Sequence, residues 1–323
     1  MLYNEKEVDL SVALWLATDT YDHDDTVISA TGLIKPLKKI ILAGRVPDAE
    51  RMGDVINNVA SSIGTAVHDS IESAWVNNYK ESLANMGYSK AVIDSVLVNP
   101  TVEERKANPD KAYVFTERRT KKVIDGVTIS GEYDFCAEGR VEDFKTTGTY
   151  TYEKNTKENE YRLQGSIYRW LDPEIITQDV MTIQYIFTDW KRNPIMAGPN
   201  YPKAAVESQT IELLSYEETE AWIKNKLADI EKYKDLPESE IPRCTQEDLW
   251  QDDAKYKYYA DPLKVGGRST KNFNSGVEAE QWKNDKGKGI VVEELGKVRA
   301  CAYCDGFSAC KQKDEYMTLG ILV

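Results

Sequence analysis

The spacing of apolar residues predicts a long helix in the first third of the chain. Between about residues 48 and 87, apolar side chains recur every four residues, at Val55, Val59, Ile63, Val67, Ile71 and Trp75. This is the pattern of a helix with one apolar stripe. A shorter helix is expected over 89–98, with Ser89 as its N-cap.

The pattern changes to that of β-strands between residues 111 and 146. This segment is rich in β-branched and aromatic residues, and Asp125-Gly126 and Glu138-Gly139 divide it. Both dipeptides favour tight hairpin turns, so we expect consecutive antiparallel strands here.

Further patterns predict a helix, two strands and a helix, at about 156–172, 179–190, 208–214 and 216–234 in turn. Ser215 and Glu218 have the spacing of a capping box at the start of the last helix. Helices mixed with strands predict an α/β (α+β) fold, in which helices flank a mixed sheet. We expect a lead-in over 1–47, a core over 48–240 and an extension over 241–323.

Composition sets limits on function. The 323 residues include 41 Lys+Arg and 54 Asp+Glu, for a net charge of −13. This charge argues against nucleic-acid binding through overall attraction, but 111–122 and 261–290 are locally basic. Each stretch is either a wall of a nucleic-acid groove or an ordinary solvated surface. We find no apolar run of about 18 residues and no basic region before the first apolar stretch, so a cytoplasmic protein is expected.

Two carboxylates stand out in the predicted hairpin. If residues 137–140 form its turn, Asp134 lies opposite Asp143, and strand alternation puts Lys145 on the face of Asp143 and Glu142 on the other. Opposed like charges need a lysine, a shared proton or a divalent cation to neutralise them. Mg²⁺ or Mn²⁺ suits such oxygen ligands, and a lysine beside them can orient or deprotonate water for phosphodiester hydrolysis. The alternative is an exposed hairpin with ordinary charges.

A histidine could complete this metal site. His68 lies in GTAVHDSIE, where Gly64 and Glu72 share its helix face. An imidazole there is either a metal ligand or a side chain that only packs in the helix.

Four motifs occur in order over about 50–172: GTAVHDSIE, GEYD, EDFK and QGSIY. Together they resemble the RecB-type branch of the PD-(D/E)XK nuclease superfamily, and its phage-encoded members in particular. The resemblance implies a restriction-endonuclease-like mixed sheet and a divalent-metal-dependent DNA exonuclease. It would act in phage DNA replication, recombination or repair, with DNA as its substrate and phage recombination or replication proteins as candidate partners. A structure-specific endonuclease is the alternative within the superfamily.

The resemblance also implies roles for individual residues. His68, Asp134 and Asp143 would bind the metal, together with the backbone carbonyl of Phe144. Lys145 would activate or position the attacking water.

One helix carries the last of the four motifs. In YRLQGSIYRWL, Gln164 and Tyr168 are spaced i,i+4 and lie beside an apolar stripe. They could steady the charged groups of the hairpin or contact a nucleic-acid strand, and the resemblance gives both a part in the active site or in DNA contact.

Four of the five cysteines suggest a second metal centre. Cys301, Cys304 and Cys310 lie in CAYCDGFSAC, and Cys244 is a distant fourth. Four thiolates can bind Zn²⁺ or an iron–sulfur cluster, whereas the alternative is a loose set of free thiols. Several RecB-type nucleases close their core with a four-cysteine [4Fe–4S] cluster, so the resemblance favours that cluster over zinc, although no cysteine precedes the core here. Cys136 is expected to be a small buried residue.

Other functions fit parts of the pattern. A binding or assembly module could keep the nuclease fold without turnover, and a redox or regulatory iron–sulfur protein would need only its cysteines. For a nucleic-acid groove, the basic segments 118–122 and 264–288 would supply walls. The aromatic residues available to stack on bases are Trp250, Tyr256, Tyr258 and Tyr259.

Overall fold

The computed structural model describes residues 2–18, 24, 26–47, 53–192 and 198–323. The chain forms two compact units, Met1–Ile34 with Met52–Leu227, and Lys35–Arg51 with Ala228–Val323. It therefore passes between the units three times, the last time within one helix, α10 (Tyr216–Tyr233).

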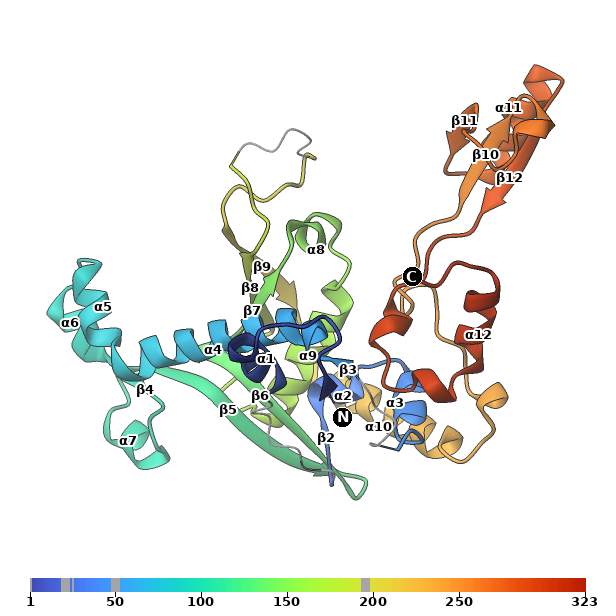
Figure 1. Cartoon of the computed structure of the whole chain (residues 1–323). Coiled ribbons are helices and arrows are strands. Elements are labelled where there is room, and N and C mark those ends of the chain that lie inside the picture. The colour runs from blue at the N-terminus through green and yellow to red at the C-terminus, as the bar shows by residue number, and fades with distance from the viewer. Residues whose placement is uncertain (1, 19–23, 25, 48–52, 193–197) are drawn as a thin grey trace. The chain divides into compact units, whose positions relative to one another are not determined.

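The first unit is built on a seven-stranded mixed sheet in the order β4-β5-β6-β7-β8-β9, with β2 beside β6 (Figure 1). The strands are β2 (Val27–Ser29), β4 (Val96–Val98), β5 (Ala112–Ile124), β6 (Val127–Ala137), β7 (Arg140–Thr147), β8 (Val180–Phe187) and β9 (Val206–Glu212). β5, β6 and β7 are antiparallel neighbours, whereas β7 and β8 are parallel. A separate parallel pair consists of β1 (Leu2–Tyr3) and β3 (Gly53–Asp54).

The two hairpins form where the sequence predicted them. Asp125 and Gly126 have φ values of 49° and 80°, and Glu138 and Gly139 have 50° and 78°. Two consecutive positive φ values match the right-handed twist of the strands on either side. The predicted α/β fold, with helices flanking a mixed sheet, is confirmed.

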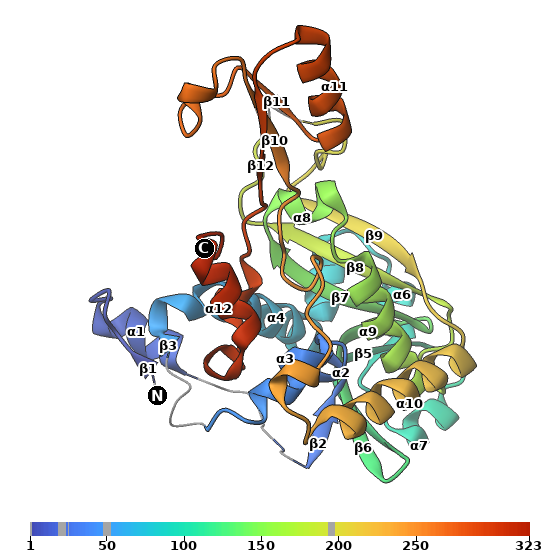
Figure 2. The same ribbon diagram turned by 90° about the vertical axis from the view of Figure 1, so that its right-hand side faces the viewer.

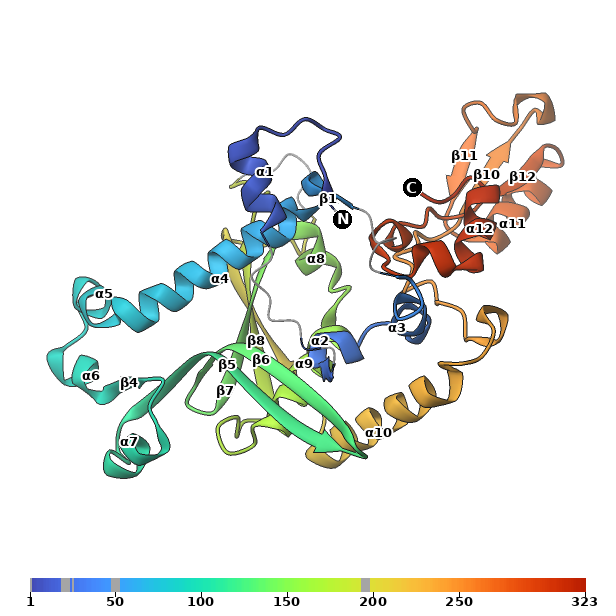
Figure 3. The ribbon, with the colours of Figure 1, turned by 60° about the horizontal axis from the view of Figure 1, so that its bottom comes forward.

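Helices cover the sheet: α9 (Glu158–Leu171) packs on β5, β6, β8 and β9, and α4 (Val59–Asn77) packs on β5 and β7. Figure 3 shows α4 running from α1 towards α5 and α6. The remaining helices of this unit are α1 (Leu10–Ala17), α2 (Ala30–Leu33), α5 (Tyr79–Asn85), α6 (Lys90–Ser95), α7 (Val102–Ala107) and α8 (Thr149–Lys154). The predicted capping box of α10 is present, because Ser215 and Glu218 exchange backbone-to-side-chain hydrogen bonds of 2.8 and 3.1 Å.

The helix expected over 48–87 is only partly correct. Its predicted start lies outside the described residues, and Val55–Asn58 form a 3₁₀ turn before α4. The apolar stripe is not a core stripe, since no side chain of α4 is fully buried and Ile63 is 36% exposed. The helix expected over 89–98 begins at its predicted cap, Ser89, but gives way to β4 because Val96–Val98 pair with β5.

The second unit combines α3 (Leu37–Ala43) with the C-terminal part of the chain. Its other elements are β10 (Lys255–Tyr259), β11 (Lys271–Phe273), α11 (Gly276–Lys286), β12 (Ile290–Glu294) and α12 (Lys311–Thr318). β10 is the central strand of an antiparallel three-stranded sheet (Figure 2). In the described part of the chain, no helix has both the length and the apolar character needed to span a membrane.

Candidate functional site

The predicted carboxylate pair lies where β6 and β7 separate. Their ladder is only three pairs long and ends at Phe135 opposite Glu142. The next position in this register places Asp134 opposite Asp143, as the sequence predicted. Both are buried, at 8% and 1% exposure.

The backbone of β7 is turned into this opening. The amide of Phe144 donates a 2.7 Å hydrogen bond to Oδ2 of Asp134, in place of a ladder bond to β6. The carbonyl oxygen of Phe144 lies 3.0 Å from Nε2 of His68 on α4. Thus the carbonyl that the resemblance implied as a ligand lies beside the implied histidine.

The alternation of β6 side chains is interrupted at Asp134. The hydroxyl of Tyr133 donates to Asp172 just after α9, and Sγ of Cys136 lies 3.9 Å from the carbonyl of Ile175 in the same connection. In a regular strand, side chains three residues apart point to opposite faces of the sheet. The side chains of Tyr133 and Cys136 nevertheless point to the same face. This irregularity turns Asp134 towards α4 and His68. Cys136 is buried as predicted.

A third acidic residue, Glu117 of β5, joins the site. On either side of it, Thr116 pairs with Phe135 and Arg118 with Tyr133, so Glu117 lies opposite Asp134. Its φ of 45° is in the left-handed region, which is uncommon for a residue other than glycine and is found at functional sites.

Glu117, His68 and Asp134 together could hold a metal ion. Nδ1 of His68 is 3.5 Å from Oδ1 of Asp134 and 3.9 Å from Oε1 of Glu117. One potential ligand atom from each residue lies within 4.8 Å of the others, and among the described residues this is the one such group of three or more.

Glu117 did not stand out in the sequence, although a usable signal was present. The turn at Asp125-Gly126 fixes the pairing of β5 with β6, and extending that register places residue 117 opposite residue 134. Glu117 was overlooked because it is the one acidic residue in the basic run KAYVFTERRTKK.

Asp143 is held from the side of α9. Its Oδ1 accepts a 2.9 Å hydrogen bond from Nε2 of Gln164, whose amide nitrogen also lies 2.8 Å from the hydroxyl of Tyr168. Its Oδ2 contacts the ammonium of Lys145. Gln164 and Tyr168 are buried, so they are placed to steady Asp143 rather than to contact DNA. Glu142 points away from the site and accepts a hydrogen bond from Gln184.

Burial and crowding of negative charge control protonation in the site. Burial, reinforced by Glu132 and Glu72, raises the pKa of Glu117 to about 7. Burial and then the charge of Asp143 raise the pKa of Asp134 well above its usual value. Burial lowers the pKa of Lys145, but Asp143 and Asp134 outweigh that effect, so its pKa is raised. Asp134 and Asp143 are buried beside this one lysine, and the partly exposed Glu117 adds a third carboxylate next to Asp134. This excess of oxygen ligands fits a hard divalent cation.

The basic side chains of 118–122, beside the site, are engaged in contacts within the protein. Arg118 is bound to Asp172, Arg119 to Glu132 and Lys121 to Asp24. Lys122 lies over the rings of Trp170 and Tyr216, 4.1 and 4.7 Å from their centroids. These contacts occupy the basic side chains within the protein, and a DNA-groove wall at 118–122 stays a prediction.

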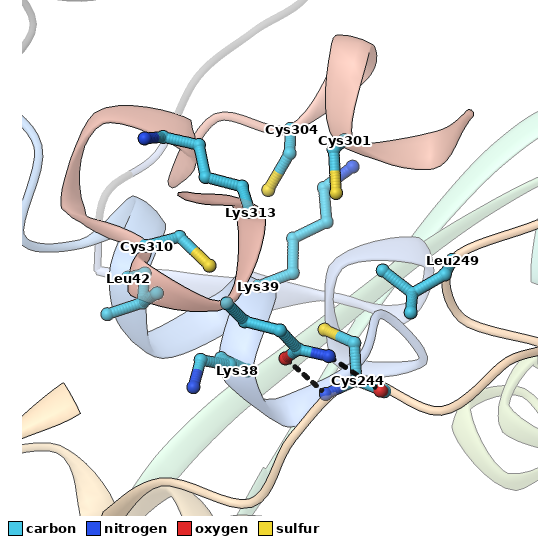
Figure 4. Close-up of a pocket in the computed structure, with 10 residues that line it drawn as sticks. Lys38, Lys39, Leu42, Cys244, Leu249, Cys301, Cys304, Cys310 and Lys313 are labelled. Atoms are coloured by element: carbon cyan, nitrogen blue, oxygen red, sulfur yellow. Dashed lines mark hydrogen bonds between the residues drawn. The ribbon is translucent and has the colours of Figure 1, made fainter. Parts of the chain in front are cut away.

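The four predicted cysteines come together in the second unit. Figure 4 shows the sulfur atoms of Cys244, Cys301, Cys304 and Cys310 directed towards a common space. Gln312, which is 3% exposed, fixes the most distant of them, since its side chain accepts from the amide of Cys244 and donates to its carbonyl, both at 3.0 Å.

The surroundings of the cysteines bear on what they could bind. Lys38, Lys39 and Lys313 also line the space, and their charges favour anionic thiolates. Burial raises the pKa of Cys244 to about 12 and that of Cys301 to about 11. Without a bound cation these thiols are therefore protonated.

Comparison with known proteins gives little help with function. No protein-family model and no curated protein matches the chain. A solved structure described as SSO0001 has a TM-score of 0.41 and 14% identity, covering 69% of this chain and 87% of that one. A phage-related exonuclease from Haemophilus somnus 129PT has a TM-score of 0.28 and 16% identity, covering 67% and 96%. These likenesses are weak, so the function has to be argued from the site.

Proposed function

We propose that the chain is a divalent-metal-dependent nuclease that hydrolyses phosphodiester bonds in DNA. The observation that supports it best is that His68, Glu117 and Asp134 could hold a metal ion at the opening between β6 and β7. The pair of Asp143 and Lys145 lies on the neighbouring strand β7. Exonuclease activity in phage DNA replication, recombination or repair is the finer form of the proposal, and it rests on the sequence resemblance.

Different residues of the site would bind the cation, orient the water and hold Asp143 in place. Glu117, Asp134 and Nδ1 of His68, with Asp143 beside them, would hold the cation, which when bound supplies an activated water and a counter-charge for phosphate. The carbonyl of Phe144 lies 3.0 Å from Nε2 of His68, so it would orient the ring rather than bind the same ion. Since Lys145 has a raised pKa, the protein without added cation holds it as an ammonium, which can orient water or a phosphate oxygen by hydrogen bonding. Gln164 would keep Asp143 in place.

Cleavage of end-labelled single- and double-stranded DNA with Mg²⁺ or Mn²⁺ tests this proposal. Asp143→Ala and Lys145→Ala should each abolish cleavage. Glu142→Gln is the matched control, because Glu142 is on the same strand but faces away from the site. Circular and linear substrates separate endonuclease from exonuclease activity. If folded, metal-supplied protein cleaves nothing, or if Lys145→Ala cleaves like the wild type, the proposal is wrong.

For the cysteines we propose a [4Fe–4S] cluster rather than a zinc ion. Four sulfur atoms directed towards one space could bind either group. The preference for the cluster rests on the sequence resemblance. Its role would be structural, because metal binding adds directly to folding stability.

Metal analysis of anaerobically purified protein tests the cluster. About four irons per chain are expected, with a Cys304→Ser variant that loses iron and becomes insoluble or proteolytically sensitive. If the analysis finds one zinc and no iron per chain, the four cysteines form a zinc site instead of the proposed cluster. If the wild type is stable without metal, or if the Cys304→Ser variant is fully stable, the cluster has no structural role.

A further inference from the structure

The β10–β12 sheet and α11 form a small module with two distinct ends. Lys255 pairs with Glu294 at one end of the ladder, where the chain enters and leaves, and Tyr259 pairs with Ile290 at the other. We call this second end the distal tip and define it as residues 260–271 and 286–289. It contains the loop from β10 to β11 and the connection from α11 to β12 (Figure 2).

Exposed cations gather at the distal tip of this module. The distal tip carries five exposed cations, at Lys264, Arg268, Lys271, Lys286 and Lys288. The one acidic residue within it, Asp261, is used to accept a hydrogen bond from the amide of Leu263. At the opposite end, Lys257 is paired with Glu294 at 2.6 Å.

The five cations lack acidic partners. Among the ion pairs of the described residues, none involves Lys264, Arg268, Lys271, Lys286 or Lys288. Arg118, Arg119 and Lys121 of β5, in contrast, are all paired. In a chain with a net charge of −13, leaving five cations together and unneutralised favours an anionic partner.

Buried tyrosines hold the loops of the tip in place. Tyr258 and Tyr259 are 2% and 4% exposed, which corrects the expectation that they stack on bases. The hydroxyl of Tyr258 donates to the carbonyl of Lys288 at 3.0 Å, and that of Tyr259 to the carbonyl of Gly267 at 3.3 Å. The cations therefore project from loops whose backbone is fixed from beneath.

The side chains at the tip fit a polyanion. Lys271 and Lys286 lie over the ring of Trp282, at 3.5 and 4.8 Å from its centroid, which keeps two cations side by side. Leu263 is 94% exposed between the charged positions. Five exposed cations on two neighbouring loops match successive phosphates better than they match a single small anion.

We propose that the distal tip binds the phosphate backbone of DNA and is a substrate-holding surface separate from the cleavage site. The identity of the polyanion rests on the proposed nuclease function. The tip contacts phosphates rather than bases, so its contribution is independent of sequence and sensitive to salt.

Binding of fluorescein-labelled DNA to the full-length protein, without added divalent cation so that the DNA stays intact, tests this proposal. Lys264→Glu/Arg268→Glu should weaken binding by about tenfold or more near 0.1 M salt and reduce the slope of log Kd against log salt by about two. Lys255→Glu/Lys283→Glu makes the same change in net charge outside the tip and should alter both quantities much less. Lys264→Gln/Arg268→Gln, which adds no negative charge, should act in the same direction as the first variant.

Two results would overturn the proposal: unchanged affinity and salt slope in the tip variants, or equal weakening by the control. The assay does not depend on cleavage. If the wild type cleaves DNA and the tip variants bind DNA normally, only the proposal for the distal tip is wrong. If the tip variants lose DNA binding but the wild type never cleaves DNA, only the proposed nuclease function is wrong.

Discussion

Glu117 is the residue at which function and stability conflict most directly. It is held in a left-handed backbone conformation, opposite Asp134, with a side chain 27% exposed. Its pKa is raised from 4.5 to about 7, so the folded protein binds this proton more tightly than the unfolded chain does. Stability from this group is therefore greatest below pH 4.5 and is lost as the pH rises through 7.

We accordingly predict that Glu117→Gln stabilises the protein at pH 8 in the absence of added divalent cation, while weakening metal-dependent cleavage. A shift from 4.5 to about 7 corresponds to at most about 3 kcal/mol, and solvent access to the side chain reduces it. Urea unfolding at pH 5 and pH 8 measures the difference. The gain should fall to about a quarter of its value at pH 8 when measured at pH 5, where Glu117 is largely protonated in the folded wild type, and should vanish only below pH 4.5. An equal gain at both pH values would mean that the charge of Glu117 is not its cause.

At the scale of elements, two hairpin turns of the same type differ in what surrounds them. Gly126 and Gly139 both have φ near 80°, but a Cβ on Gly126 would meet open space. A Cβ on Gly139 would lie 2.0 Å from Oγ1 of Thr177. The carbonyl of Gly139 also accepts from the amides of Thr177 and Gln178 at 2.9 and 3.0 Å.

We therefore predict that Gly139→Ala costs more stability than Gly126→Ala. The backbone conformation alone costs about 1 kcal/mol in each variant, and the contact with Thr177 should add about 1–3 kcal/mol at Gly139. Urea unfolding of the two variants tests this order. Gly139→Ala/Thr177→Ala should recover part of the loss, and equal losses in the two single variants would show that Thr177 gives way freely.

At the scale of the whole molecule, the cysteine centre depends on segments far apart in sequence. Cys244 reaches Cys301, Cys304 and Cys310 because Gln312 holds its backbone with two hydrogen bonds. Gln312 is buried, and both of its bonds join α12 to the backbone of Cys244.

We predict that Gln312→Met leaves all four cysteines present but releases bound metal to a chelator about tenfold faster, as loss of an outer hydrogen-bonding partner commonly does. Cys244 should also react faster with iodoacetamide in the metal-free protein. The exposed Gln281 of α11 provides the control Gln281→Met, which should behave like the wild type. Metal retention in Gln312→Met equal to that of the wild type would show that Gln312 does not position Cys244.

The local sequence was enough to predict the framework of the candidate site. Strand periodicity and the Glu138-Gly139 turn fix which residues of β6 and β7 face each other, so Asp134 could be placed opposite Asp143 without a structure. The capping box at Ser215 was equally readable. Such features depend on residues that are neighbours along the chain or across one tight turn.

Tertiary packing decided the rest. The sequence could not show that Arg118 is neutralised by Asp172, 54 positions away, or that Tyr258 and Tyr259 are buried beneath loops. Nor could it show that α4 keeps its apolar stripe partly exposed while carrying His68 to Asp134. Whether a charge is paired or a ring is buried depends on which surfaces meet in space, and that is set by the packing of whole elements rather than by the residues on either side.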